Sequence, residues 1–291
     1  MVTASLIWAT EGIVIRQVDL PAVVIAAGRM LFLALAGLGV ALLAPRLILL
    51  RPRGYERRLI VLGILTALNG WLFILAIQLT DIGIAVVVTF TWPLWLVLFY
   101  AVLRIQRPSR LALAMLFVSL FGLILLMTRP AEIVSTRDTL GIGAALLVAI
   151  TVALMLMITR SSPIDLPSPT IHFWQSGIAC ALLLPFAFAS LPATELGLAD
   201  VGLLAVLGIA ISGFGGALFL TGVRRLSSEE SGVLSYTEPV AATLIAMAVL
   251  GEVPGTRGAL GMSLVVMAGI WTIAGERGAQ RAGAEACGDT G

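Results

Sequence analysis

Three charged side chains stand inside long apolar runs of this sequence, namely Glu11, Arg29 and Glu238. A charge in a hydrocarbon layer is costly, so it usually pairs with an opposite charge, faces an aqueous cavity or binds a ligand. At 1.5 Å per helical residue, Glu11 and Arg29 lie about 9 and about 10 Å from the adjacent ends of two successive runs. We therefore predict an ion pair between them. The pair either ties two helices together or acts on a ligand, with Arg29 meeting a carboxylate or Glu11 exchanging a proton.

Proline follows Glu238 and Trp92 directly, as Pro239 and Pro93. Proline has no N–H, so it leaves a backbone carbonyl without its donor in the preceding helical turn. Kinked helices of this kind often flank the cavities of membrane proteins. Both the kinks and Glu238 can equally be features of helix packing alone. We name Pro93 and Pro239 as candidate kink or gating positions.

Further polar and aromatic side chains in the apolar runs are candidates for a cavity wall. Trp92 and Tyr236 lie deep in their runs and can stack on an aromatic or apolar ligand. His172 is the only histidine, and a histidine near a helix start more often makes a hydrogen bond than relays a proton. The complete set of candidate cavity residues is Glu11, Arg29, Asn69, Trp71, Gln78, Trp92, His172, Gln175, Tyr236 and Glu238.

The composition places these residues in a membrane. Of the 291 residues, 59% are hydrophobic and 12% are charged, whereas soluble domains contain about 45–50% apolar and about 25% charged residues. A soluble fold of this length cannot bury so much apolar surface, but a bilayer covers it. We predict an all-α integral membrane protein that crosses the inner cell membrane several times.

All 18 basic residues are arginines, and the absence of lysine excludes several functions. A P-loop ATPase needs a lysine on the nucleotide phosphates, and Schiff-base catalysis needs a lysine amine. The two cysteines, Cys180 and Cys287, form neither a disulfide framework nor a metal-binding pattern. We expect no enzyme activity, no cofactor, no metal and no nucleic-acid partner.

Ten apolar runs are bounded by charges, proline or glycine and suit helices that cross a core about 30 Å thick. Most arginines fall in the loops 45–58 and 104–110 and in the polar tail. Because cytoplasmic loops are enriched in arginine, both termini are predicted to be cytoplasmic. The first run is short for a span, and we expect the natural chain to start upstream. The runs are 2–17, 22–44, 59–79, 82–103, 111–128, 139–159, 170–191, 201–223, 231–250 and 258–274.

The third to fifth runs resemble the last three. Thr89–Pro93 falls on Ser235–Pro239, so residue 89 matches residue 235 and the shift is 146 residues. Matches of leucine and valine can arise by chance, but shared proline and glycine at one shift indicate a repeat. Five helices per half is an odd number, so the copies are inverted. We predict five-helix repeats over 1–128 and 139–275, and a cytoplasmic polar tail over 276–291.

Tyr236–Val240, followed by Leu250–Glu252, is the stretch most typical of a known family, and Trp8 and Pro21 add to it. On these residues the chain resembles the drug/metabolite transporter superfamily, in the type with two EamA domains. The resemblance covers nearly the whole length. Trp92-Pro93 departs from the usual first-half pattern and looks like the YddG-type amino-acid exporters. Many members also carry an acidic residue where this chain has none, at 104–106.

The resemblance implies a secondary transporter that exports small metabolites, such as neutral or aromatic amino acids, by alternating access. Multidrug or nucleobase efflux by the same fold and passage through a passive channel stay open. An enzyme acting on lipid-linked substrates would need clusters of His, Asp or Lys that this chain lacks. Proton coupling through Glu11 or Glu238 and simple facilitated transport both fit the sequence. The expected partners are a small-molecule substrate, the bilayer and, for a coupled carrier, protons. One chain supplies both halves, so a monomer suffices.

Overall fold

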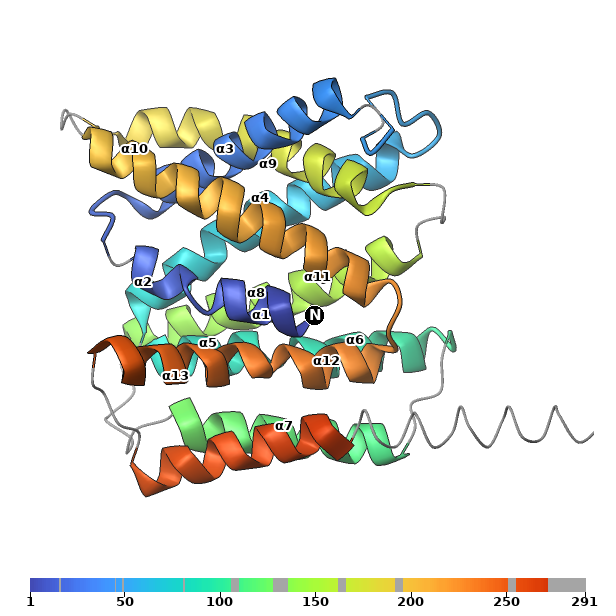
Figure 1. Cartoon of the computed structure of the whole chain (residues 1–291), viewed down its shortest axis with the longest axis vertical. Helices are drawn as coiled ribbons and strands as arrows, with labels where there is room; N and C mark the ends of the chain where they lie inside the picture. The colour runs from blue at the N-terminus through green and yellow to red at the C-terminus, as the bar shows by residue number, and fades with distance from the viewer. Residues whose placement is uncertain are drawn as a thin grey trace, which may run out of the picture.

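The computed structural model is built of helices whose axes run roughly parallel (Figure 1). No β-strand occurs within the residues that it describes, and this confirms the prediction of an all-α protein. These residues are 1–15, 17–44, 46–48, 50–80, 82–105, 110–127, 136–161, 166–191, 196–250 and 255–271. The predicted tail 276–291 lies outside them.

Six helices continue without a break within the described residues, namely the final helix, Thr256–Trp271, and five that carry labels. Four of the labelled ones begin near residues that favour a helix start, such as Pro21 before the second run and Asp138 in the first turn of another. The ends differ from the predicted runs by a few residues because polar first turns such as that at Glu56 escape a search for apolar runs. The five are α3 (Ala22–Leu43), α4 (Glu56–Leu79), α7 (Arg110–Met127), α8 (Thr136–Arg160) and α9 (Ser168–Ser190).

Four other apolar runs contain irregular turns. The first is divided into α1 (Val2–Trp8) and α2 (Glu11–Ile15). Two more are divided just before their prolines, and one passes through a π-helical segment. These elements are α5 (Ile82–Thr89) with α6 (Trp92–Val102), α12 (Ser228–Ser235) with α13 (Thr237–Leu250), and α10 (Leu198–Ala205) with η1 (Val206–Gly215) and α11 (Gly216–Val223). A final apolar helix covers Thr256–Trp271.

Six helical segments of the described chain are long and apolar enough to cross a membrane. Two shorter apolar helices, Leu113–Leu126 and Thr256–Trp271, accompany them. The chain direction alternates between successive helices in Figure 1. The count of ten crossings and the cytoplasmic placement of both termini stay predictions. The six spans are Ala22–Leu43, Glu56–Leu79, Ile84–Val102, Thr136–Arg160, Ser168–Ser190 and Leu198–Val223.

The helices are stacked in layers (Figure 1). α3, α9 and the α10–η1–α11 helix form one side, α1 and α8 lie in the middle, and α5–α6 with α12–α13 follow. α7 and the final helix form the opposite edge. They touch through glycines, since a Cβ on Gly122 would lie 2.7 Å from the Gly261 carbonyl oxygen. Such close backbone contacts are typical of helices packed in membranes.

Gly208 allows η1 to pack directly on α3. A Cβ at this position would lie 2.6 Å from the Arg29 carbonyl oxygen and 2.6 Å from the Phe32 Cβ atom. Neither neighbour is the flexible end of a side chain. The backbone of η1 therefore fixes the turn of α3 that carries Arg29.

We predict that Gly208→Ala lowers the unfolding temperature of the purified protein in detergent, because overpacking costs about 1–3 kcal/mol. The matched control is Gly202→Ala, one and a half turns earlier in α10, where a Cβ would meet nothing within 4 Å. That control should keep or raise the unfolding temperature, since alanine is favoured over glycine in helices by about 0.5–1 kcal/mol. Equal shifts in both variants would contradict the tight contact.

Candidate functional site

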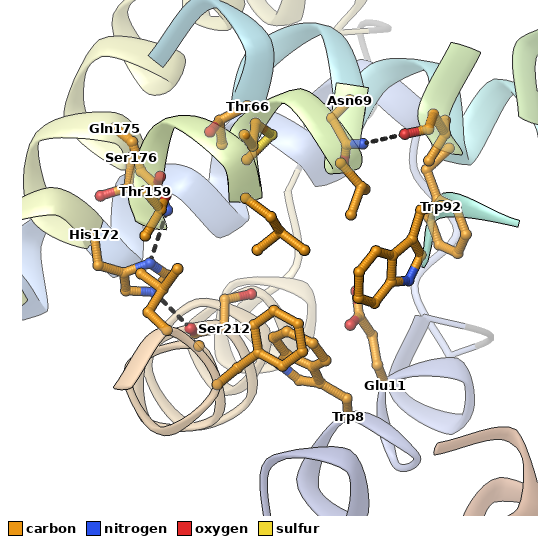
Figure 2. Close-up of a pocket in the computed structure, with 18 of the residues that line it drawn as sticks. Trp8, Glu11, Thr66, Asn69, Trp92, Thr159, His172, Gln175, Ser176 and Ser212 are labelled. Atoms are coloured by element: carbon orange, nitrogen blue, oxygen red, sulfur yellow. Dashed lines mark hydrogen bonds between the residues drawn. The ribbon is translucent and has the colours of Figure 1, made fainter. Parts of the chain in front are cut away.

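A cavity of about 270 Å³ lies among helices of both predicted halves. Figure 2 shows its wall, with hydroxyl, amide and imidazole groups on one side and tryptophan rings and Glu11 on the other. Seven of the ten predicted cavity residues line it. They are Glu11, Arg29, Asn69, Trp92, His172, Gln175 and Glu238.

The predicted ion pair between Glu11 and Arg29 is present. The Arg29 Nη1 atom donates to the Glu11 Oε1 atom, and the two side chains keep 20% and 15% of their surface exposed, Glu11 the larger share. Glu11 can reach Arg29 because α1 ends at Trp8 and a turn closed by the Thr10 hydroxyl, 2.7 Å from the Ile7 carbonyl oxygen, restarts the helix. The pair thus joins the first two predicted spans at the cavity wall.

Glu238 brings a second carboxylate to the same cavity. It occupies the first turn of α13, where the positive end of the helix dipole favours an acid. Its carboxylate interacts electrostatically with that of Glu11. The arginine of the cavity wall, Arg29, is paired with Glu11, and Glu238 faces the cavity without an arginine partner among the described residues.

The two proline-containing helices meet at their breaks. The Tyr236 hydroxyl donates to the Phe90 carbonyl oxygen over 2.9 Å, and the two rings lie 6.0 Å apart. Phe90 and Tyr236 are equivalent in the 146-residue repeat. A break inside an apolar layer exposes backbone groups that must find partners within the protein. Tyr236 supplies one such partner across the boundary between the predicted halves.

Pro93 and Pro239 begin new helices instead of bending continuous ones. Pro93 is the second residue of α6, and Pro239 is the third residue of α13. The predicted kinks are thus breaks between two helices in each case, whereas the role of the prolines in gating stays a prediction. Each break brings the residue before the proline, Trp92 or Glu238, to the cavity wall.

His172 uses both ring nitrogens in hydrogen bonds, as the dashed lines in Figure 2 show. Its Nε2 atom lies 2.8 Å from the Ser212 carbonyl oxygen, which can only accept, so Nε2 carries the proton. Its Nδ1 atom therefore accepts from the Gln175 amide over 2.9 Å. These contacts give the histidine a structural task, which is to satisfy a carbonyl of the π-helical segment.

Trp8 and Asn69 make similar bonds across the cavity wall. The Trp8 indole donates to the Ile211 carbonyl oxygen over 3.1 Å, one residue before the carbonyl that His172 binds. The Asn69 amide donates to the Thr151 hydroxyl over 2.9 Å and to the Val148 carbonyl oxygen over 3.3 Å. Because both N–H groups of Asn69 are used, this side chain has only its carbonyl oxygen left for a ligand.

Three predicted cavity residues do not line the cavity. Trp71 is 41% exposed on the outside of the helix bundle, where it stacks on Phe186. Gln78 is exposed near the end of α4. Both predictions are corrected by helix geometry, because residues two and nine positions after Asn69 point to the opposite face of an α-helix. Tyr236 is fully buried and binds Phe90 behind the wall.

Helical spacing would have found several wall residues that the sequence analysis missed. Thr66 and Phe73 are three residues before and four residues after Asn69, and Ser176 is four residues after His172. Thr159 lies in the last turn of α8 and Phe219 in α11, and the other missed residues lie in or beside the irregular turns, which no simple spacing predicts. The missed polar and aromatic residues are Trp8, Thr66, Phe73, Thr89, Phe90, Thr159, Ser176, Ser212, Phe219 and Ser235.

The comparisons with known proteins agree with this architecture. A family model described as the EamA-like transporter family matches residues 1–128 and 139–274. The chain belongs to the EamA-like transporter family. This membership confirms the resemblance drawn from Tyr236–Val240 and makes the protein a multi-pass membrane transporter.

A solved structure described only as "Crystal structure of protein" has the same fold as this EamA-like chain. The two are 21% identical, with a TM-score of 0.79 over 93% of each chain. At this identity the likeness concerns the fold alone. No curated protein matches the chain.

We predict that Tyr236→Phe lowers the unfolding temperature, because the Phe90 carbonyl loses its donor at the cost of about 0.5–1.5 kcal/mol. Thermal unfolding in detergent micelles measures this effect. Phe90→Leu is the matched comparison, since it removes the ring contact and keeps the carbonyl acceptor. An unchanged unfolding temperature for Tyr236→Phe would show that the bond does not hold the breaks together.

Proposed function

We propose that this EamA-like protein exports a small zwitterionic metabolite, such as a neutral or aromatic amino acid, across the inner membrane. The observation that carries the proposal is one cavity that presents an arginine, two carboxylates and aromatic rings. A guanidinium recognises a carboxylate, a carboxylate recognises an ammonium group, and tryptophan covers an apolar side chain. A volume of about 270 Å³ suits one small molecule.

Alternating access between inverted halves is the mechanism that the arrangement favours. The cavity extends from the middle of the helices toward Thr159 and His172, which lie near the ends of α8 and α9. Arg160 and Arg224 are at the same end, as are the arginine-rich loops. Under the positive-inside rule this end is cytoplasmic. We infer an inward-facing state with ten crossings and both termini inside.

The charge balance supports a second candidate substrate class. Two carboxylates and one arginine line the cavity, so an organic cation would also find a partner there. Efflux of amphipathic cationic drugs is therefore the alternative. A zwitterion needs Arg29 to bind its carboxylate, whereas a cation does not. The effect of removing Arg29 therefore distinguishes the two classes of substrate.

We predict that Arg29→Gln abolishes exchange of labelled for unlabelled amino acid in proteoliposomes and weakens binding at least about tenfold, because a charged hydrogen bond is lost. A thermal-shift screen of amino acids and cationic drugs first selects the ligand. Arg137→Gln is the control, since Arg137 is exposed and binds the Gln78 carbonyl oxygen far from the cavity. Normal exchange by Arg29→Gln, with cationic drugs as the stabilising ligands, would favour the drug-efflux alternative.

Glu238 is the group best placed to couple transport to protons. Arg29 already neutralises Glu11, and both nitrogens of His172 are occupied, so neither is as free to exchange a proton. A substrate ammonium and a proton would compete for the Glu238 carboxylate. Such competition produces exchange of substrate for protons.

We predict that Glu238→Gln loses accumulation driven by a pH gradient and keeps exchange when substrate is saturating, since the amide resembles the protonated acid. Uptake of labelled substrate into proteoliposomes with and without the gradient measures both activities. Glu56→Gln is the control, because that carboxylate is exposed and caps the Gly54 N–H. If Glu238→Gln still accumulated substrate in response to the gradient, proton coupling would belong to another residue. If the wild-type protein did not accumulate substrate either, the carrier would be facilitative.

A further inference from the structure

We propose that the two proline breaks form the site for the substrate's ammonium group, with acceptors from Thr89 and Ser235 beside the Glu238 carboxylate. This inference rests on the proposed function and names the part of the cavity that recognises the amine. It assigns one end of a zwitterion to the breaks and the other end to Arg29.

Thr89 is the first observation. Its side chain is only 7% exposed, lines the cavity, and has a buried hydroxyl oxygen without a hydrogen-bond partner among the described residues. A buried hydroxyl without a partner is unfavourable, and such groups are rare in folded proteins. A hydroxyl left unpaired at a cavity wall is explained when the ligand completes its hydrogen bonds.

The prolines supply the second observation. Pro93 cannot donate to the Thr89 carbonyl, and Pro239 cannot donate to the Ser235 carbonyl, four residues earlier in each case. No other described backbone N–H takes their place. Thr89 and Ser235 are equivalent in the repeat, and both line the cavity. Each predicted half therefore contributes one backbone acceptor that its own helix does not satisfy.

The hydroxyl of Ser235 also favours a donor ligand. It donates to the Ser231 carbonyl oxygen over 2.6 Å, so only its lone pairs remain. The two unwound carbonyls and the Ser235 oxygen can only accept, the Thr89 hydroxyl can accept as well as donate, and an ammonium group has three N–H donors. A carboxylate would meet three acceptors here and a single possible donor, the Thr89 hydroxyl. The chemistry thus selects a cation that donates hydrogen bonds.

Glu238 provides the charge. It is three residues after Ser235, faces the cavity, and lacks an arginine partner among the described residues. Arg29, by contrast, belongs to α3 and is held by Glu11. The negative and positive groups therefore come from different helices. A zwitterion placed between them has its ammonium at the breaks and its carboxylate at Arg29.

The test measures binding of three probes to the purified full-length protein by calorimetry. Phenylalanine carries both charged groups, phenethylamine has only the amine, and 3-phenylpropionate has only the carboxylate. Thr89→Val removes the hydroxyl at nearly constant shape. It should weaken phenylalanine and phenethylamine at least about fivefold, since one hydrogen bond to a charged group is lost, and leave 3-phenylpropionate unchanged. Thr89→Ser keeps the hydroxyl and should bind like the wild type.

Thermal unfolding without ligand separates recognition from structure. Thr89→Val should unfold at the same or a higher temperature, because the hydroxyl has no partner among the described residues. A lower unfolding temperature, with equal loss of all three probes, would show a structural role and overturn the proposal. The same measurement tests for a metal cation. If NaCl raised the unfolding temperature more than KCl did, and Thr89→Val removed this difference but left amine binding unchanged, the acceptors would bind a metal cation. That result would also overturn the proposal.

The outcomes distinguish this inference from the function on which it rests. If wild-type protein binds phenylalanine and Thr89→Val binds both amines equally well, the site is wrong and the amino-acid proposal stands. If wild-type protein binds phenethylamine alone and Thr89→Val weakens it, the amine site stands and the substrate is a cation. If neither amine binds the wild type, both ideas are wrong.

Discussion

The structure depends on how two broken helices are satisfied inside an apolar layer. A break leaves backbone carbonyls without donors, and hydrocarbon cannot replace them. The hydroxyl of Tyr236 donates a hydrogen bond to the Phe90 carbonyl oxygen over 2.9 Å, and the two residues occupy equivalent positions of the repeat. The contact therefore joins the predicted halves at their proline breaks. It also lets the residues beside the prolines turn toward one cavity.

Side chains donate hydrogen bonds to backbone carbonyls at other places around the cavity as well. His172 and Trp8 donate to neighbouring carbonyls of η1, at Ser212 and Ile211, and thereby stabilise a π-helical segment, a form that is rare in proteins. Asn69 joins α4 to α8 in the same way. These polar residues hold the wall in place. In the proposed function, recognition of the substrate is left to Arg29, the Glu238 carboxylate and the unpaired acceptors of the breaks.

Much of the fold and of the site followed from the sequence, for identifiable reasons. Apolar runs revealed the helices because no soluble core could hide them, and the cost of intramembrane charge led to Glu11, Arg29 and Glu238. The errors came from treating every polar residue of a run alike. Trp71 lies on the wrong face of the helix that Asn69 fixes. The π-helix is held by donors from other helices, His172 and Trp8, so no local pattern revealed it.

At the proline breaks the repeat matches in backbone but not in chemistry. Trp92 and Glu238 occupy equivalent positions, since 92 and 238 differ by 146, and both line the cavity. One half thus contributes an aromatic ring where the other contributes a carboxylate. If the inverted halves exchange conformations, the backbone symmetry makes the two access states similar in energy. On the proposed function, the unlike side chains at these two positions would then favour the same orientation of a zwitterion in both states.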